Sequence, residues 1–202
     1  NFRNWRVDPD PEFANNIIIQ DNYFQDNPLF SSGTSIGIVV NESGTAPNEI
    51  YNNTFSAVNY GILAQGINRN PRTGEGLVCK CNEFSNAGYD IVVTDIDESE
   101  STDFGIAQYQ GSSAAQPDAP AGNRFSWTGP TGTDTDIDNL GLHFNYYYHV
   151  DQYEPLEPKY YDSLKVNAEP NYNAPWDTLA SCPSYIDTIG GSTEEEIRGM
   201  LA

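Results

Sequence analysis

The tripeptide Asn-x-Phe recurs along the chain and constrains the fold more than any other feature. It occurs four times, at spacings of 31, 29 and 41 residues. After the second and third copies the downstream sequence repeats as well, as "SAVNYGILA" and "SNAGYDIVV", with Ile62 and Ile91 each seven residues beyond their phenylalanine. Self-similarity at a period of this size is typical of repeat architectures.

The repeats contain short β-type runs broken by Asn, Gly and Ser, and no convincing amphipathic helix precedes residue 192. Short strands without helices for βαβ crossovers favour an all-β fold, a right-handed parallel β-helix in which successive coils stack at the strand spacing. A β-sandwich is the structural alternative. Chance repetition in an Asn-rich chain explains the downstream register less well.

Equivalent residues of successive coils lie above one another in a β-helix. Asparagine side chains at equivalent bends can hydrogen-bond along the stack, and aromatic side chains can stack in its core. We therefore predict an Asn ladder beside an apolar column. The ladder comprises Asn22, Asn53, Asn82 and Asn123, and the column comprises Phe24, Phe55, Phe84 and Phe125.

The length of 202 residues suits one main domain. We expect coils over residues 1–150 and an irregular Pro- and Tyr-rich tail over 151–191, because prolines at 155, 158, 170 and 175 interrupt regular elements. The tail should pack Tyr160, Tyr161, Tyr172 and Trp176 on the coils.

Both ends of the chain suggest a piece of a larger polypeptide. The first residue is Asn1, without an initiator Met or a signal-peptide pattern. Residues 192–202, "STEEEIRGMLA", begin like a helix with Ser192 or Thr193 as N-cap and stop after barely two turns. We expect a truncated helix there.

The charge excludes several kinds of partner. Twenty-nine acidic and nine basic residues give a net charge of -20, which repels nucleic acid and anionic membrane surfaces. No apolar run approaches the roughly 20 residues of a membrane-spanning helix. The aromatic content of 12 % and the 17 glycines are typical of a secreted β protein rather than a disordered acidic tail.

The Cys-x-Cys in "GLVCKCNEF" raises the question of a metal site. Alternation along a strand predicts that Cys79 and Cys81 face the same side. Zinc requires two further ligands, for which Cys182, His143 and His149 are a thin supply. We interpret Cys81 as a core residue beside the ladder. Cys182 either pairs with Cys79 or stays free; pairing with Cys81 is also open.

Three blocks resemble a known family. They are "GLVCKCNEFSNAGYDIVVTD", "AGNRFSWTGPTGTDTDIDNLGLHFNYYYH" and "CPS" followed by an acidic helix start. They resemble the C-terminal right-handed β-helix segment of large secreted surface proteins of Bacteroidetes, which usually end in a type IX secretion sorting domain. The resemblance spans most of residues 16–200. It implies the fold, a secreted or cell-surface location and that export route, but supplies no catalytic residue, and no sorting domain is visible.

An enzyme is the alternative function, since parallel β-helices include polysaccharide lyases and glycoside hydrolases. The basic candidates are Arg69 and Arg72 in the loop "GINRNPRTGEG" and Lys80 and Arg124 within coils, and acids cluster over residues 95–103 and 134–138. A catalytic pair should project from neighbouring coils onto one sheet face, whereas these acids crowd loops. The sequence therefore favours a non-catalytic module.

The segment "DTDIDNLG" is a candidate Ca²⁺ site through Asp134, Asp136 and Asp138. An EF-hand is rejected, because Asn139 and Asn145 stand where it requires Gly and Glu. The alternatives are an irregular Ca²⁺ loop and a solvated turn.

Aromatic side chains on a rigid polar scaffold suit sugar binding, because their faces stack on pyranose rings. The candidates are Trp5, Trp127 and Trp176. We expect an extracellular structural or recognition module that acts in adhesion or glycan binding, with glycans or other surface proteins as partners.

Overall fold

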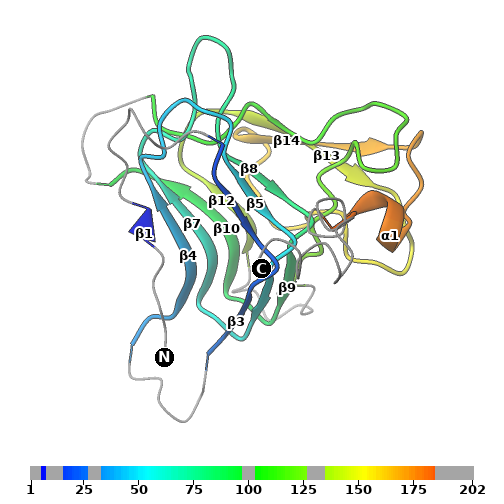
Figure 1. Cartoon of the computed structure of the whole chain (residues 1–202), viewed down its shortest axis with the longest axis horizontal. Coiled ribbons are helices and arrows are strands. Elements are labelled where there is room, and N and C mark those ends of the chain that lie inside the picture. The colour runs from blue at the N-terminus through cyan, green and yellow to red at the C-terminus, as the bar shows by residue number, and fades with distance from the viewer. Residues whose placement is uncertain (1–5, 8–15, 27–32, 97–102, 127–134, 185–202) are drawn as a thin grey trace, which may run out of the picture.

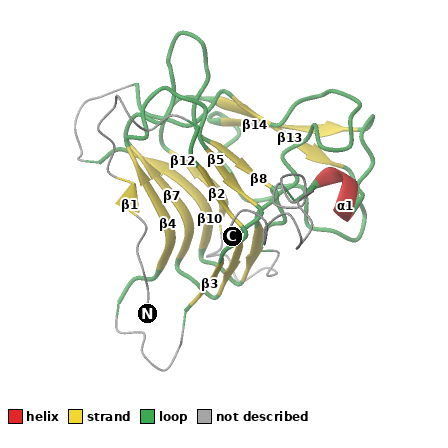
Figure 2. Ribbon diagram, in the orientation of Figure 1, coloured by secondary structure: helices red, strands yellow, loops and turns green. Residues whose placement is uncertain are grey.

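The chain folds almost entirely into short β-strands. The computed structural model describes residues 6–7, 16–26, 33–96, 103–126 and 135–184. Within these ranges the one α-helix is α1 (Thr178–Ser181), which is four residues long (Figure 2). The expected all-β class is confirmed. The same residues contain no helix long and apolar enough to cross a membrane.

The strands form four sheets in which every pair of named strands is parallel. The largest sheet has the order β1 (Arg6–Val7), β4 (Ile36–Asn41), β7 (Tyr60–Gln65), β10 (Tyr89–Thr94) and β12 (Thr135–Asn139). The second has β2 (Ile18–Gln20), β5 (Glu49–Tyr51) and β8 (Val78–Lys80). The third has β3 (Tyr23–Gln25), β6 (Thr54–Ser56) and β9 (Glu83–Ser85), and the fourth has β11 (Tyr109–Gln110), β13 (Phe144–His149) and β14 (Val166–Asn171).

Three sheets arise from one repeated unit of three strands. The units are β2-β3-β4, β5-β6-β7 and β8-β9-β10, and each strand pairs with its counterpart in the next unit. Figure 1 shows β4, β7 and β10 side by side, with β2, β5 and β8 forming a separate layer. The repeat in the sequence is therefore a repeat in register: Phe55 pairs with Phe84, and Ile62 pairs with Ile91.

The four repeated asparagines form a continuous row of hydrogen bonds. Asn22, Asn53 and Asn82 each donate from Nδ2 to Oδ1 of the next asparagine, at 3.0, 3.2 and 3.1 Å. Their backbone N–H groups donate to the same oxygens at 3.0, 3.1 and 2.8 Å. Asn53, Asn82 and Asn123 are buried, so these bonds satisfy polar groups that water does not reach.

The four repeated phenylalanines stack beside this row. The centroid distances from Phe24 to Phe55, from Phe55 to Phe84 and from Phe84 to Phe125 are 5.1, 5.0 and 6.3 Å, with rings within 13° of parallel. The stack ends on Tyr146, whose ring is tilted by 57° to that of Phe125. Isoleucines from the large sheet complete the core between the layers.

A left-handed residue precedes each asparagine of the row and turns the chain between two sheets. These residues are Asp21, Asn52, Cys81 and Gly122, with φ of 56, 52, 59 and 66°. Positive φ is unfavourable for most side chains, so its recurrence marks a bend that the stacking imposes. The bend at Cys81 also corrects the expectation that Cys79 and Cys81 face the same side.

The cysteines pair differently from the preferred expectation. Cys81 forms a disulfide with Cys182, 101 residues away, whereas Cys79 is a buried free thiol. Cys79 lies inside β8 and faces the core, while Cys81 follows that strand at the bend. The alternation of side-chain direction along β8 therefore does not extend to Cys81, which instead forms its disulfide with the C-terminal segment.

Part of the predicted tail is regular. Residues 166–171 form β14, which pairs with β13 along six residues including Pro170. This strand is the last of its sheet, an edge position in which a missing N–H is tolerated. Tyr161 packs against the core as expected, but Tyr172 is 77 % exposed. Residues 192–202 lie outside the described part.

Candidate functional site

A groove of about 440 Å³ lies on the outer face of the sheet β2-β5-β8. Three different units contribute to it, because alternate residues of each short strand point away from the core. In β5 the inward residue is Ile50, and in β8 it is Cys79, both fully buried. The outward positions line the groove together with neighbouring loops: Asn16, Ile18, Pro47, Asn48, Glu49, Val78, Lys80, Tyr109 and Gly111.

Tyr109 supplies an exposed aromatic surface in this groove. It begins the two-residue strand β11, and 53 % of its surface is exposed. Ile18 is 49 % exposed and belongs to the same lining. An aromatic ring with nearby apolar and amide groups is a suitable surface for a sugar ring, whose faces are apolar and whose edges carry hydroxyls.

The charged residues of the groove belong to neighbouring units. Glu49 and Lys80 come from β5 and β8, and the Lys80 Nζ donates to the carbonyl oxygen of Asp118. Arg69 lies close enough to Tyr109 to interact with it electrostatically, and burial lowers the pKa of this arginine. Its Nη1 donates to the carbonyl oxygen of His143 at 2.8 Å. Arg69 therefore connects two loops.

A second charged cluster follows the sheet β3-β6-β9. Glu83 of β9 is in register with Arg124, and the guanidinium contacts Glu83 Oε1 at 3.3 Å and Glu154 Oε2 at 2.8 Å. Two carboxylates and one arginine thus meet on one face, as the enzyme alternative requires. The guanidinium is engaged by both carboxylates, which leaves it less available to a substrate.

Among the other residues considered for a lyase or hydrolase, Arg72 and the described acids of residues 95–103 lie outside the named strands. Arg72 and Asp103 are exposed, and residues 97–102 lie outside the described part. The described hydrogen bond of the Arg69 guanidinium is to the backbone oxygen of His143.

Two of the three aspartates proposed for Ca²⁺, Asp136 and Asp138, lie in a strand rather than in a loop or turn. Residues 135–139 form β12, and Asp136 is buried with Oδ2 accepting the N–H groups of Lys159 and Tyr160 at 2.5 and 3.0 Å. Burial raises the pKa of Asp138. Asp134 is outside the described part. No cluster of three potential metal ligands occurs in residues that the structure describes.

Trp176 is the one tryptophan proposed for glycan binding that the structure describes, and it does not line the groove. Trp176 is half-buried, and its ring meets that of His149 edge-on at 5.0 Å. His149 is buried with Nδ1 at 2.9 Å from the Ala174 carbonyl oxygen, and burial lowers its pKa. These contacts join the tail to β13. Trp5 and Trp127 lie outside the described residues.

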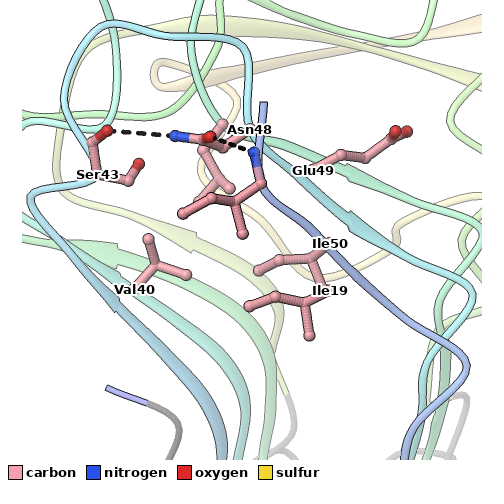
Figure 3. A pocket seen from close by; sticks show the side chains of 8 residues that line it. Ile19, Val40, Ser43, Asn48, Glu49 and Ile50 are labelled. Carbon is pink, nitrogen blue, oxygen red and sulfur yellow. Dashed lines mark hydrogen bonds between the residues drawn. The ribbon is translucent and has the colours of Figure 1, made fainter. Parts of the chain in front are cut away.

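A smaller cavity lies behind the groove, inside the first units (Figure 3). Ile19, Val40 and Ile50 point into it, whereas the side chain of Glu49 points away. Its volume of about 10 Å³ holds at most one water molecule. It is a packing defect and not a ligand site.

Sequence reasoning missed the groove residues, although a signal was present. "EIY" and "VCK" each place one apolar residue between two that point outward, and the repeat aligns them in register. Applying strand alternation to these segments would have identified Glu49 and Lys80. Tyr109 could not be assigned this way, because it follows a stretch without the Asn-x-Phe pattern.

Comparison of the chain with protein-family models, with curated proteins and with solved structures gives no match. The function must therefore be inferred from the geometry of the chain itself.

Proposed function

We propose that this chain is a recognition module of a secreted or cell-surface protein, and that the groove on β2-β5-β8 binds a glycan. The stacked units would form a right-handed parallel β-helix that presents the groove rigidly. The observation that carries the proposal is the exposed ring of Tyr109 in a 440 Å³ groove whose other walls come from three stacked units.

The chemistry of the groove fits a neutral polysaccharide best. Tyr109 provides a ring for stacking, while Asn16, Glu49 and Lys80 provide polar groups for hydroxyls. A strongly anionic polysaccharide would be repelled by the net charge of -20, which one lysine does not offset. A rigid scaffold favours such weak contacts, because little conformational entropy is lost on binding.

A panel of polysaccharides and an arrayed glycan library test the proposal, with and without Ca²⁺. The wild-type chain should retain at least one neutral glycan and release no unsaturated or reducing ends. Tyr109→Ala should weaken retention about fivefold or more, because aromatic stacking contributes about 1–3 kcal/mol to such contacts. Tyr153→Ala is the matched control, since this tyrosine is 81 % exposed and does not line the groove.

A polysaccharide lyase or glycoside hydrolase is the second candidate function. It is favoured by the meeting of Glu83, Arg124 and Glu154 on one face. If the wild-type chain releases product in the same panel and the Glu154→Gln variant does not, the chain is this enzyme and not a binding module. If both the wild-type chain and the Glu154→Gln variant retain a glycan and release no product, the cluster of Glu83, Arg124 and Glu154 is a structural ion pair.

A further inference from the structure

The row of asparagines is complete at one end and open at the other. Oδ1 of Asn53, Asn82 and Asn123 each accepts two N–H groups from the preceding unit. Oδ1 of Asn22 accepts none from the described residues, although this asparagine donates like the others. The hydrogen-bonding pattern of the row is therefore unfinished at Asn22.

The apolar column ends in the same way. Phe24 stacks on Phe55 but is only partly buried, whereas Phe55 in the equivalent position is 0 % exposed. Ile19 is likewise partly buried while Ile50, its partner in register, is 0 % exposed. Figure 3 shows Ile19 and Ile50 pointing the same way into the core. The inward residues of β2 and β3 thus lack the layer that covers their counterparts in the next unit, whereas Ile38 and Val40 of β4 are buried.

The opposite end of the stack is closed by the chain itself. Asn123 donates from Nδ2 to Tyr146 Oη at 3.1 Å, and Tyr146 is buried against the ring of Phe125. β13 and β14 follow beyond it. Among the described strands, the end formed by β2 and β3 presents an outermost strand pair with a free row position.

The large sheet already extends past the first unit. β1 pairs in parallel with β4, so Arg6 and Val7 occupy the register of a preceding unit. β2 and β3 are the outermost strands of their own sheets. Among the described strands, the stacking interface therefore continues on one side and stops on the other two, where two short strands joined by a bend would extend it.

We propose that the edge formed by β2 and β3 is a docking site for a further unit of the Asn-x-Phe repeat, supplied as an extended strand-bend-strand segment. Its backbone would add parallel strands to β2 and β3. Its asparagine would donate N–H and Nδ2 to Asn22 Oδ1, and its phenylalanine would cover Phe24. The partner is defined by this chemistry, and the interface continues the one between β2-β3 and β5-β6.

The probe is a labelled synthetic peptide with the sequence of residues 47–57, "PNEIYNNTFSA", which contains one strand-bend-strand segment of this chain. Fluorescence anisotropy follows its binding to the whole chain. The wild-type peptide should bind saturably. A peptide carrying Asn53→Ala should bind at least tenfold more weakly, because it cannot complete the row with its side-chain N–H group and no longer orders the bend.

Substitutions in the chain provide the second arm. Asn22→Ala removes the acceptor and should weaken binding of the wild-type peptide about tenfold, with the far-ultraviolet circular dichroism spectrum unchanged. Asn86→Ala is the control, since this exposed residue lies at a different bend. Tyr109 lies against β8, at the opposite edge of the sheet from β2, so Tyr109→Ala should leave peptide binding unaltered.

Three results would overturn the proposal. They are equal binding of the wild-type and Asn53→Ala peptides, no saturable binding of either peptide to the folded chain, and self-association of the chain that Asn22→Ala abolishes. The last result, measured by sedimentation velocity, would assign the edge to a second copy of this chain instead.

Discussion

Removal of one buried member of the asparagine row tests how the stack is stabilised. Asn82 is 0 % exposed, and its side chain takes part in four hydrogen bonds. Oδ1 accepts Asn53 N and Nδ2 at 3.1 and 3.2 Å, and Nδ2 donates to Ile50 O and Asn123 Oδ1 at 2.9 and 3.1 Å. At about 1 kcal/mol for each bond, Asn82→Ala should lower the free energy of unfolding by about 4 kcal/mol.

Asn22→Ala is the matched control at the open end of the row. Its side chain donates two hydrogen bonds and accepts none from the described residues, in a partly buried position that water can reach. We expect a loss of about 1 kcal/mol. Guanidinium denaturation followed by circular dichroism and tryptophan fluorescence measures both values, with the denaturant slope as a check on the mechanism. Equal losses in the two variants would refute the assignment of stability to the row.

Three further predictions concern the disulfide, the core and the free thiol. Reduction of Cys81–Cys182 should lower the free energy of unfolding by about 4–5 kcal/mol in the chain-entropy model, measured as the shift between oxidised and reduced denaturation curves. Gly61→Ala would place a Cβ 2.6 Å from a core phenylalanine ring and should cost about 1–3 kcal/mol in the same assay, whereas Gly33→Ala, with no atom within 4 Å, should be nearly neutral. Burial raises the pKa of Cys79 from 9.0 to about 12, so the thiol should resist alkylation at pH 8 until the chain unfolds. Since the unfolded thiol loses its proton first, this group should reduce stability as the pH rises from about 9 toward 12, seen as a falling denaturation midpoint.

The parts of the fold that depend on the period were predictable from the sequence. Stacking places residues one period apart in contact, so the spacing of Asn53 and Asn82, or of Phe55 and Phe84, was sufficient to bring them together. No distant contact had to be known for this inference. The same reasoning gave the all-β class, and α1 is the one α-helix among the residues that the structure describes.

The parts that depend on distant contacts were not predictable. Cys81 turns toward Cys182 because the chain bends there with a positive φ, which strand alternation does not anticipate. Asp136 lies in a strand that pairs with β10, and its buried carboxylate accepts two N–H groups from residues 159 and 160, although Asp-x-Asp is typical of loops. The groove likewise requires Tyr109 to meet β5 and β8, and nothing local in the sequence specifies that meeting.

Hydrogen–deuterium exchange with and without a retained glycan tests the central claim most directly. The account predicts slower exchange in residues 47–51, 78–80 and 109–111 together, because these separate segments form one groove. Residues 151–153, which do not line it, should exchange at an unchanged rate. Protection confined to residues outside the groove, or no protection at saturating glycan, would contradict the assignment of β2-β5-β8 as the binding face.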